Sequence, residues 1–197
     1  MTAQIHNSFI FKDQEYSIVG VNGQGLFDPA SYGLNPLGLC SACWRGYLCQ
    51  YSLKENLLHL IWLRINIGNS NSKNSDVREW PVINGVHPTK PPEDYPIFDS
   101  IYQNLNLPIK FSGGILLGNG FISELYVHMG SHLAWKFQTV HELIFKKGTV
   151  REIREVSQRV AEIRKKILTN SPVWEVNADS HQLEDWIRST FRLDYQL

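Results

Sequence analysis

"HLAWKFQTVHELIFKKGTV", residues 132–150, decides the fold, because an earlier stretch, "SACWRGYLCQYSLKENLLHL" at residues 41–60, has the same plan. Each stretch places a tryptophan and a cation before a run in which apolar and polar residues alternate, and a short polar turn follows. Alternation with a period of two predicts a half-buried strand, and two such runs joined by a tight turn predict a β-hairpin. Gly148 suits the positive φ of the second turn. The chain is therefore expected to contain two similar hairpins.

A glycine motif precedes each hairpin. "NGQGLF" at residues 22–27 matches "LGNGFI" at residues 117–122, so the order of features is the same in an internal repeat of residues 16–66 and 109–155. One copy cannot bury its apolar face alone, which predicts that the two halves pack about a pseudo-two-fold axis. The expected result is an open barrel or a pair of facing, mostly antiparallel sheets. Chance similarity within a β-rich chain is the alternative.

The remaining segments complete an α+β fold in a single domain, residues 1–197. A connecting loop at 67–98 begins with the polar tract "NSNSKNS" and becomes rich in proline. In the C-terminal segment, 157–190, apolar residues at three- and four-residue steps predict a helix at 158–168, with Ser157 as its cap. The same spacing begins near Val150, but the first hairpin favours a strand up to Arg154. A second helix is expected at about 180–190.

Composition excludes several classes of protein. The formal net charge is zero, so no overall field attracts nucleic acid or an anionic membrane. No basic start with a long apolar run is present, and no stretch approaches the roughly 18 apolar residues of a membrane helix. The cysteines are odd in number and crowded into residues 40–49, which favours a reducing compartment. We therefore expect a cytoplasmic protein that does not bind a membrane.

One cluster of polar residues could carry catalysis. It consists of Glu124, His128, His132, His141 and Glu142. A histidine held by a glutamate can act as a general base, so a small, hydrolytic enzyme is one hypothesis. The sequence has no nucleophile elbow, phosphate-binding loop or dinucleotide-binding glycine motif, and no zincin glutamate stands between His128 and His132. We therefore expect no cofactor.

The duplicated tryptophan and cation offer a second candidate site. Its residues are Trp44, Arg45, Tyr47, Trp135 and Lys136, which could form a cleft for an anionic or planar ligand. The sequence favours a structural role instead, because duplication preserves structural needs in both halves while a ligand site needs only one.

A metal site is only weakly indicated. Cys40, Cys43 and Cys49 could ligate zinc, but the second ligand pair of a typical zinc motif is missing, so these residues are expected to be small core residues and no metal is expected.

Basic residues gather in the second half of the chain. They are Lys146, Lys147, Arg159, Arg164, Lys165 and Lys166, which could contact phosphates or an acidic protein. A solvated helix face, neutralised by the acidic C-terminal tail, is the favoured alternative. Nucleic-acid association is thus a minor hypothesis.

The leading hypothesis is a small, non-enzymatic binding or regulatory module that acts through a protein partner. A high content of aromatic residues makes a protein-facing surface plausible. Self-association is left open, and the enzyme with a His/Glu pocket is the competing hypothesis.

Overall fold

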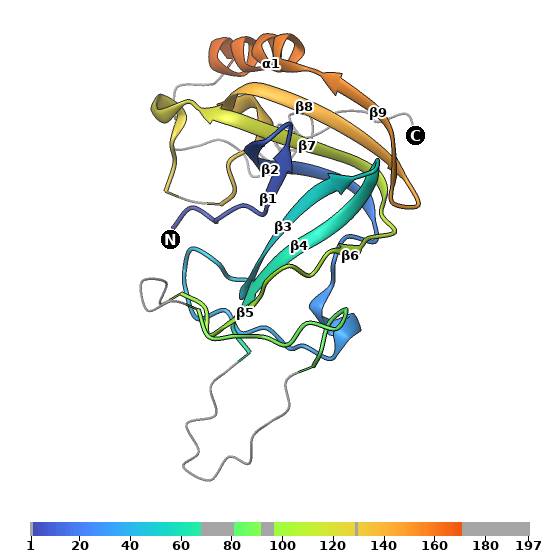
Figure 1. Ribbon diagram of the computed structural model, residues 1–197. Helices are drawn as coiled ribbons and strands as arrows, with labels where there is room; N and C mark the ends of the chain where they lie inside the picture. Colours follow the sequence, from blue (N-terminus) through green and yellow to red (C-terminus); the bar gives the residue numbers. More distant parts are fainter. Residues whose placement is uncertain (1, 68–80, 92–96, 129, 171–197) are drawn as a thin grey trace.

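The computed structural model describes residues 2–67, 81–91, 97–128 and 130–170 (Figure 1). Strands dominate these residues, and one α-helix follows them. The strands are β1 (Ser8–Phe11), β2 (Gln14–Gln24), β3 (Tyr47–Lys54), β4 (Leu57–Ile65), β5 (Ser100–Tyr102), β6 (Leu107–Pro108), β7 (Ser112–Phe121), β8 (Phe137–Lys146) and β9 (Thr149–Glu155). The helix α1 spans Ser157–Asn170, and short 3₁₀ turns occur at Pro29–Tyr32, Ser123–Leu125 and Ala134–Lys136.

The strands form one sheet whose order closes on itself. The order is β3-β1-β2-β7-β8-β9-β4, and β4 then pairs with β3. Every pairing in this ring is antiparallel except that of β1 with β3. The contact between β9 and β4 is a single bridge, Leu57 with Thr149, so the two strands diverge beyond it. Further along β4, the same edge pairs with β6 and then with β5.

The principal core fills the inside of this ring. Alternation along each strand sends one set of side chains inward, among them Tyr51, Leu58, Ile115 and Leu143, and all four are buried. β7 is apolar on both faces, because its opposite side is covered as well. Leu116 points outward there and packs in a second cluster that includes Val160 of α1.

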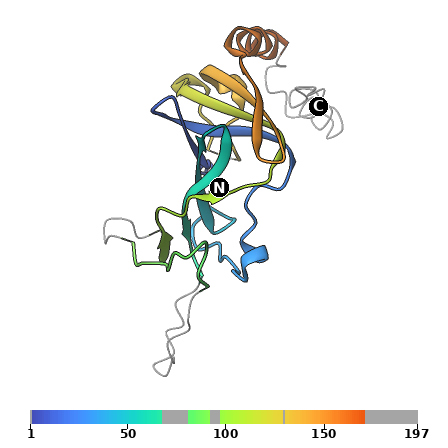
Figure 2. The same cartoon turned by 45° about the vertical axis from the view of Figure 1, so that its right-hand side comes forward.

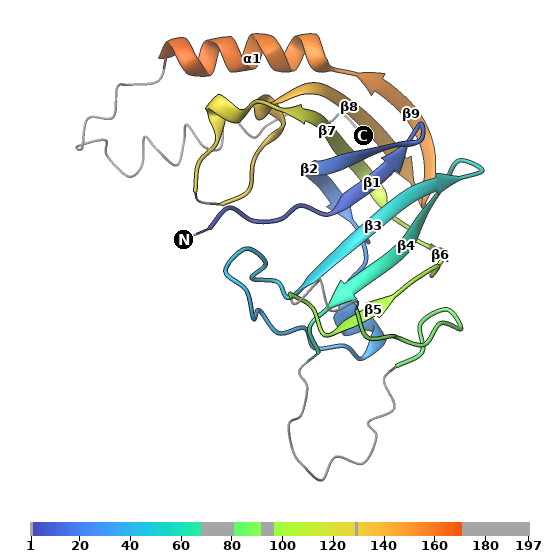
Figure 3. The ribbon, with the colours of Figure 1, turned by 60° about the vertical axis from the view of Figure 1, so that its left-hand side comes forward.

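Helix α1 lies across the outer face of β7 and β8 (Figures 1 and 3). Two polar anchors hold it. Near its start, the Ser157 hydroxyl accepts a hydrogen bond of 3.0 Å from the Val140 N–H of β8. Further along, the Arg164 guanidinium donates to the carbonyl oxygens of Trp135 and Phe137, both at 2.6 Å. The helix therefore has a fixed position over the sheet.

Two glycines let β2 and β7 approach each other closely. Gly23 and Gly113 are paired across the strands and have φ angles of +149° and +143°. A Cβ atom on Gly113 would lie 2.1 Å from the Asn22 carbonyl oxygen, and one on Gly23 would lie 2.3 Å from that of Ser112. Only glycine fits both positions, so these residues are required where the ring passes from one half of the chain to the other.

Much of the predicted architecture is present. The structure is mostly strands in a mixed, mostly antiparallel sheet, and a helix ends the described part of the chain. Both predicted hairpins occur, as β3–β4 and β8–β9. The strand β9 ends at Glu155 and α1 begins at Ser157, each within one residue of the boundary that the comparison of the two hairpins predicted, although Ser157 is the first residue of the helix and not its cap.

The pseudo-two-fold repeat is not confirmed. In the second half, β7 pairs directly with β8, whereas in the first half β1 lies between β2 and β3. The strands form one continuous sheet, so the predicted alternative of two facing sheets is not observed. The tract "NSNSKNS" and the helix expected at 180–190 lie outside the described residues. None of the helices in the described ranges is long and apolar enough to cross a membrane.

Candidate functional site

The loop before β3 exposes several large apolar side chains. Leu37, Leu39 and Trp44 are exposed by 44%, 67% and 57%, and the adjoining Ile5 by 37%. We call these four residues the Trp44 patch. Single exposed apolar residues are ordinary on protein surfaces, but several on neighbouring segments are typical of interaction sites. The patch is therefore the first candidate for a functional surface.

Backbone hydrogen bonds fix the geometry of this loop. The Leu37 N–H donates to the Asn66 carbonyl oxygen at 2.8 Å, and the Ile5 N–H donates to that of Ala42 at 2.8 Å. Gly38 lies so close to Trp44 that a Cβ atom there would be 2.4 Å from the Trp44 carbonyl oxygen. The exposed side chains thus stand on an ordered backbone, which lowers the entropic cost of binding a partner.

Arg45 serves this loop structurally. Its guanidinium donates to the Tyr47 carbonyl oxygen at 2.8 Å, to the Ile5 carbonyl oxygen at 3.1 Å and to Asn7 Oδ1 at 2.9 Å. It also lies 5.6 Å from the ring centre of Tyr47. The cation therefore ties the N-terminal segment to the start of β3, and the neighbouring Trp44 remains exposed.

The second pair, Trp135 and Lys136, is less exposed than the first pair, Trp44 and Arg45. Lys136 is only 5% exposed, its Nζ lies 5.2 Å from the Trp135 ring centre, and Trp135 is half-buried. The Lys136 Nζ also lies 3.4 Å from His132 Nδ1. The predicted cleft shared by the two pairs is not formed by equivalent residues, because one pair is exposed and the other is covered.

His132 and Lys136 are buried, and they lie beside the half-buried His6. The His132 ring packs against Phe121 and Tyr126, with centroid distances of 4.7 Å and 5.1 Å. His6 Nδ1 lies 3.0 Å from the Ile18 carbonyl oxygen and so carries the proton that it donates. The Nε2 atoms of both imidazoles are buried without a hydrogen-bond partner in the described part of the chain. These three residues thus join imidazoles to a cation, not to the carboxylate that the general-base hypothesis requires.

The other proposed catalytic residues lie apart. Glu124 and His128 are exposed, and the His128 ring contacts Tyr126. His141 and Glu142 are neighbours on β8 and point to opposite faces of the sheet. His141 is opposite the inward-facing Leu117, while Glu142 is opposite the outward-facing Leu116. The structure therefore does not bring these residues into one pocket.

Burial shifts the pKa values of several of these groups. Desolvation lowers the pKa of His6, His132 and His141, and the nearby Lys136 lowers that of His132 further. Desolvation also lowers the pKa of Lys136 and raises that of Glu142. The folded chain therefore favours the neutral imidazoles.

Acidification is expected to destabilise the protein through these histidines. A lowered histidine pKa adds stability that is fully present above the unfolded value of about 6.5 and is lost as the pH falls through the folded value. The His141 ring contacts the rings of Phe11 and Tyr16, so His141→Phe keeps the ring contacts and removes the titration. We expect the free energy of unfolding, measured with urea, to fall more between pH 7.5 and pH 5.5 in the wild type than in His141→Phe. An equal or smaller fall in the wild type would contradict this expectation. Glu142 is present in both proteins, so its titration does not affect the comparison.

Two of the three cysteines, Cys43 and Cys49, are core residues, and Cys40 is not. All three are free, Cys43 and Cys49 are buried, and Cys40 is half-buried. Desolvation raises the pKa of Cys43, and it raises that of Cys49 to about 12, so neither is a ready thiolate. Within the described ranges, no group of three or more histidine, cysteine, aspartate or glutamate residues is arranged to hold a metal ion.

The basic residues fall into two separate groups. Lys146 and Lys147 are exposed at the turn between β8 and β9. Arg159, Lys165 and Lys166 are exposed on α1, which begins beyond the far end of β9. Arg164 uses its guanidinium to anchor the helix, as described above. The turn and the helix therefore lie at opposite ends of β9.

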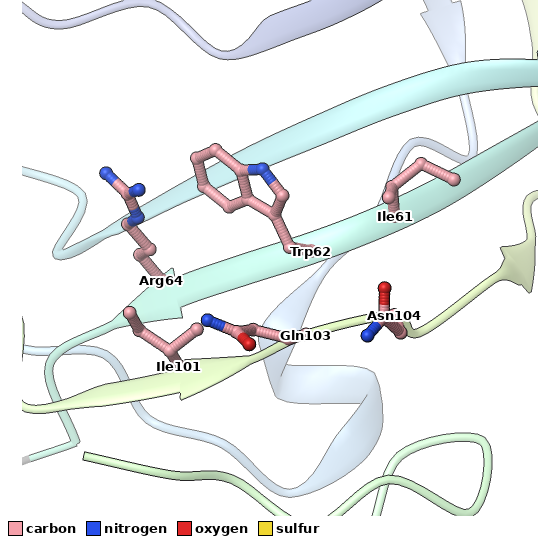
Figure 4. A pocket seen from close by; sticks show the side chains of 6 residues that line it. All are labelled: Ile61, Trp62, Arg64, Ile101, Gln103 and Asn104. Atoms are coloured by element: carbon pink, nitrogen blue, oxygen red, sulfur yellow. The ribbon is translucent and has the colours of Figure 1, made fainter. Parts of the chain in front are cut away.

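A shallow hollow lies beside the outer face of β4 (Figure 4). Its volume is about 220 Å³, and it is lined by Ile61, Trp62, Arg64, Ile101, Gln103 and Asn104. The Arg64 guanidinium lies 4.5 Å from the Trp62 ring centre. Small-molecule sites usually occupy roughly 300–1,000 Å³, so this hollow is too small for a typical ligand of that kind.

No family model, curated protein or solved structure matches this chain. The functional argument therefore depends on the geometry of its own residues.

Sequence reasoning missed four residues of these sites: Leu37, Leu39, Ile5 and His6. Leu37 and Leu39 stand in "NPLGLCSACW", where apolar residues without periodicity among proline and glycine could have indicated an exposed loop. His6 gave no local signal. It reaches His132 because the N-terminal segment pairs with the distant loop at Gly130, where the Gln4 N–H donates to the Gly130 carbonyl oxygen.

Proposed function

We propose that this protein is a non-enzymatic binding module that contacts a protein partner through the Trp44 patch. The observation that supports this function is the exposure of Trp44, Leu37 and Leu39 on a loop held by hydrogen bonds. Tryptophan is enriched among the residues that dominate binding energy, because its ring buries a large area with few rotatable bonds. A cytoplasmic location is part of the proposal, and the three free cysteines are consistent with it.

The enzyme hypothesis has weaker support. General-base catalysis needs a histidine within hydrogen-bond reach of the group it activates, commonly with a carboxylate to orient it. Here His132 meets a lysine, and Glu124 is exposed on the preceding loop. Binding through an apolar surface requires no such arrangement.

Capture experiments on Trp44→Ser test the proposal. The purified full chain is used to capture proteins from cells that contain it, and each captured protein is quantified by mass spectrometry. We expect a specific partner to be recovered at least about tenfold less with Trp44→Ser, because a central aromatic contact is lost. Leu168→Ser is the matched control, since Leu168 is 55% exposed on α1.

The comparison between the two variants decides the outcome. A protein that is lost with Trp44→Ser and retained with Leu168→Ser supports the patch as the contact surface. If every captured protein binds Trp44→Ser as well as it binds the wild type, the proposal is wrong.

A further inference from the structure

The outer edge of β9 is open over most of its length. β9 pairs with β8 along its length except at Arg151, and β4 reaches it only at the bridge between Leu57 and Thr149. The Val150 N–H still donates to the Asn56 carbonyl oxygen at 2.9 Å. Beyond that bond, no strand in the described ranges pairs with this edge, which Figure 2 turns towards the viewer. α1 runs back over β8 and β7, away from the edge (Figure 3).

The backbone of this edge has hydrogen-bonding groups to offer. The Val156 N–H donates to the Val140 carbonyl oxygen of β8 at 2.8 Å. Successive residues of a strand direct these groups to alternate sides, so those of Ile153 and Glu155 point away from β8. An unpaired edge of this kind is a template for another strand.

The side chains along this edge are complementary to themselves. Residues 151–155 read Arg-Glu-Ile-Arg-Glu. When two copies run antiparallel and are centred on Ile153, Glu152 is opposite Arg154 of the second copy, and Arg151 is opposite Glu155 of the second copy. Ile153, which is 44% exposed, then meets Ile153 of the second copy. We propose that β9 pairs in this way with β9 of a second copy of the chain, about a two-fold axis at Ile153.

The charges also select this register. Because only residues whose backbone groups face outward can pair with each other, the centre of symmetry can move only by whole residues. Moving it one residue towards the N-terminus would place Glu152 opposite Glu152 of the second copy, and moving it the other way would place Arg154 opposite Arg154 of the second copy. A parallel pairing in register would place like charges opposite each other throughout. Opposite charges across strands stabilise a sheet, and like charges destabilise it. Within one copy, Glu152 and Arg154 already form a bidentate ion pair at 2.6 Å. Self-pairing would bring two such pairs together in a network of four charges.

Charged residues on an edge commonly serve only to prevent aggregation. That role does not require complementarity about one centre, nor an exposed isoleucine at that centre. One position is less regular, because Arg151 has no partner on β8 at the bulge between Ile144 and Phe145. The pair of Glu152 with Arg154 is therefore expected to contribute more to the contact than the pair of Arg151 with Glu155.

Two charge variants test the self-pairing by sedimentation velocity on the full chain. Glu152→Arg/Glu155→Arg makes the edge wholly positive, and Arg151→Glu/Arg154→Glu makes it wholly negative. We expect the wild type to dimerise with rising concentration, and each variant alone to dimerise at least roughly tenfold more weakly. An equimolar mixture of the two variants should dimerise again, because opposite charges then meet.

Matched controls keep the test specific. Lys165→Glu/Lys166→Glu changes the net charge as much as the negative edge variant does, but acts on α1, so its dimerisation should equal that of the wild type. Ile153→Pro removes an outward N–H and should also prevent dimerisation. A monomeric wild type at every concentration, or a mixture that fails to associate, overturns the inference. Neither result bears on the Trp44 patch, which lies on a different surface.

Discussion

Replacing Gly113 with alanine is expected to lower the free energy of unfolding by about 3 kcal/mol or more. The added Cβ would lie 2.1 Å from the Asn22 carbonyl oxygen and 2.7 Å from Gly23 Cα, and both of these atoms belong to the backbone. Neither can move aside as a flexible side chain could, so β2 and β7 must separate locally. Chemical denaturation followed by circular dichroism measures the loss.

Gly85→Ala is the matched control for the backbone conformation. Gly85 also has a positive φ, +78°, but a Cβ atom there meets nothing within 4 Å. Its substitution should cost only the conformational strain, roughly 1–2 kcal/mol. Equal losses of unfolding free energy in the two variants would mean that the close approach of β2 and β7 adds nothing to the cost of the Gly113 substitution. That result would contradict the described pairing.

Asn66→Ala is expected to destabilise the protein by about 3 kcal/mol, because two partly buried backbone groups lose their partners. Asn66 is 2% exposed, and its side chain donates to the Ile97 carbonyl oxygen at 2.8 Å and accepts from the Asp99 N–H at 3.0 Å. Its own backbone bonds to Leu37 and Gly46 on the loop of the Trp44 patch. This residue therefore joins the end of β4 to two separate segments.

The measurement for Asn66 is again the free energy of unfolding. Asn35→Ala, at an exposed asparagine of the same loop region, should change it by no more than about 0.5 kcal/mol. A loss at Asn66 as small as that at Asn35 would mean that the two side-chain hydrogen bonds do not stabilise the fold.

Local elements could be predicted from the sequence, but their order in the sheet could not. Alternation in "GYLCQYSL" and "FQTVHELIF" was sufficient for the two hairpins, because the side-chain period of a strand is visible in a few residues. The parallel pairing of β1 with β3 joins residues more than forty positions apart, as in Phe9 with Tyr51. No local pattern encodes such a pairing, since it depends on how the whole ring closes.

For the candidate sites too, the sequence indicated individual residues but not how they are arranged in space. The exposed side chain of Trp44 was among the residues that the sequence selected, but its similarity to Trp135 suggested a shared role that their different exposure does not support. His128 and His132 are four residues apart, yet one is exposed and the other is buried. Gly130, which lies between them, has a positive φ of +69° and forms a bridge with Ala3, so helical spacing does not apply.

Site-specific photo-crosslinking at position 44 tests the central claim most directly. The full chain carries a benzophenone amino acid as Trp44→p-benzoyl-phenylalanine, and a second chain carries it as Leu168→p-benzoyl-phenylalanine on α1. After irradiation in cells, we expect a discrete adduct with another protein from position 44 and none from position 168. The absence of any adduct at position 44, or the same adduct from both positions, would contradict the account of this protein as a binding module that uses the Trp44 patch.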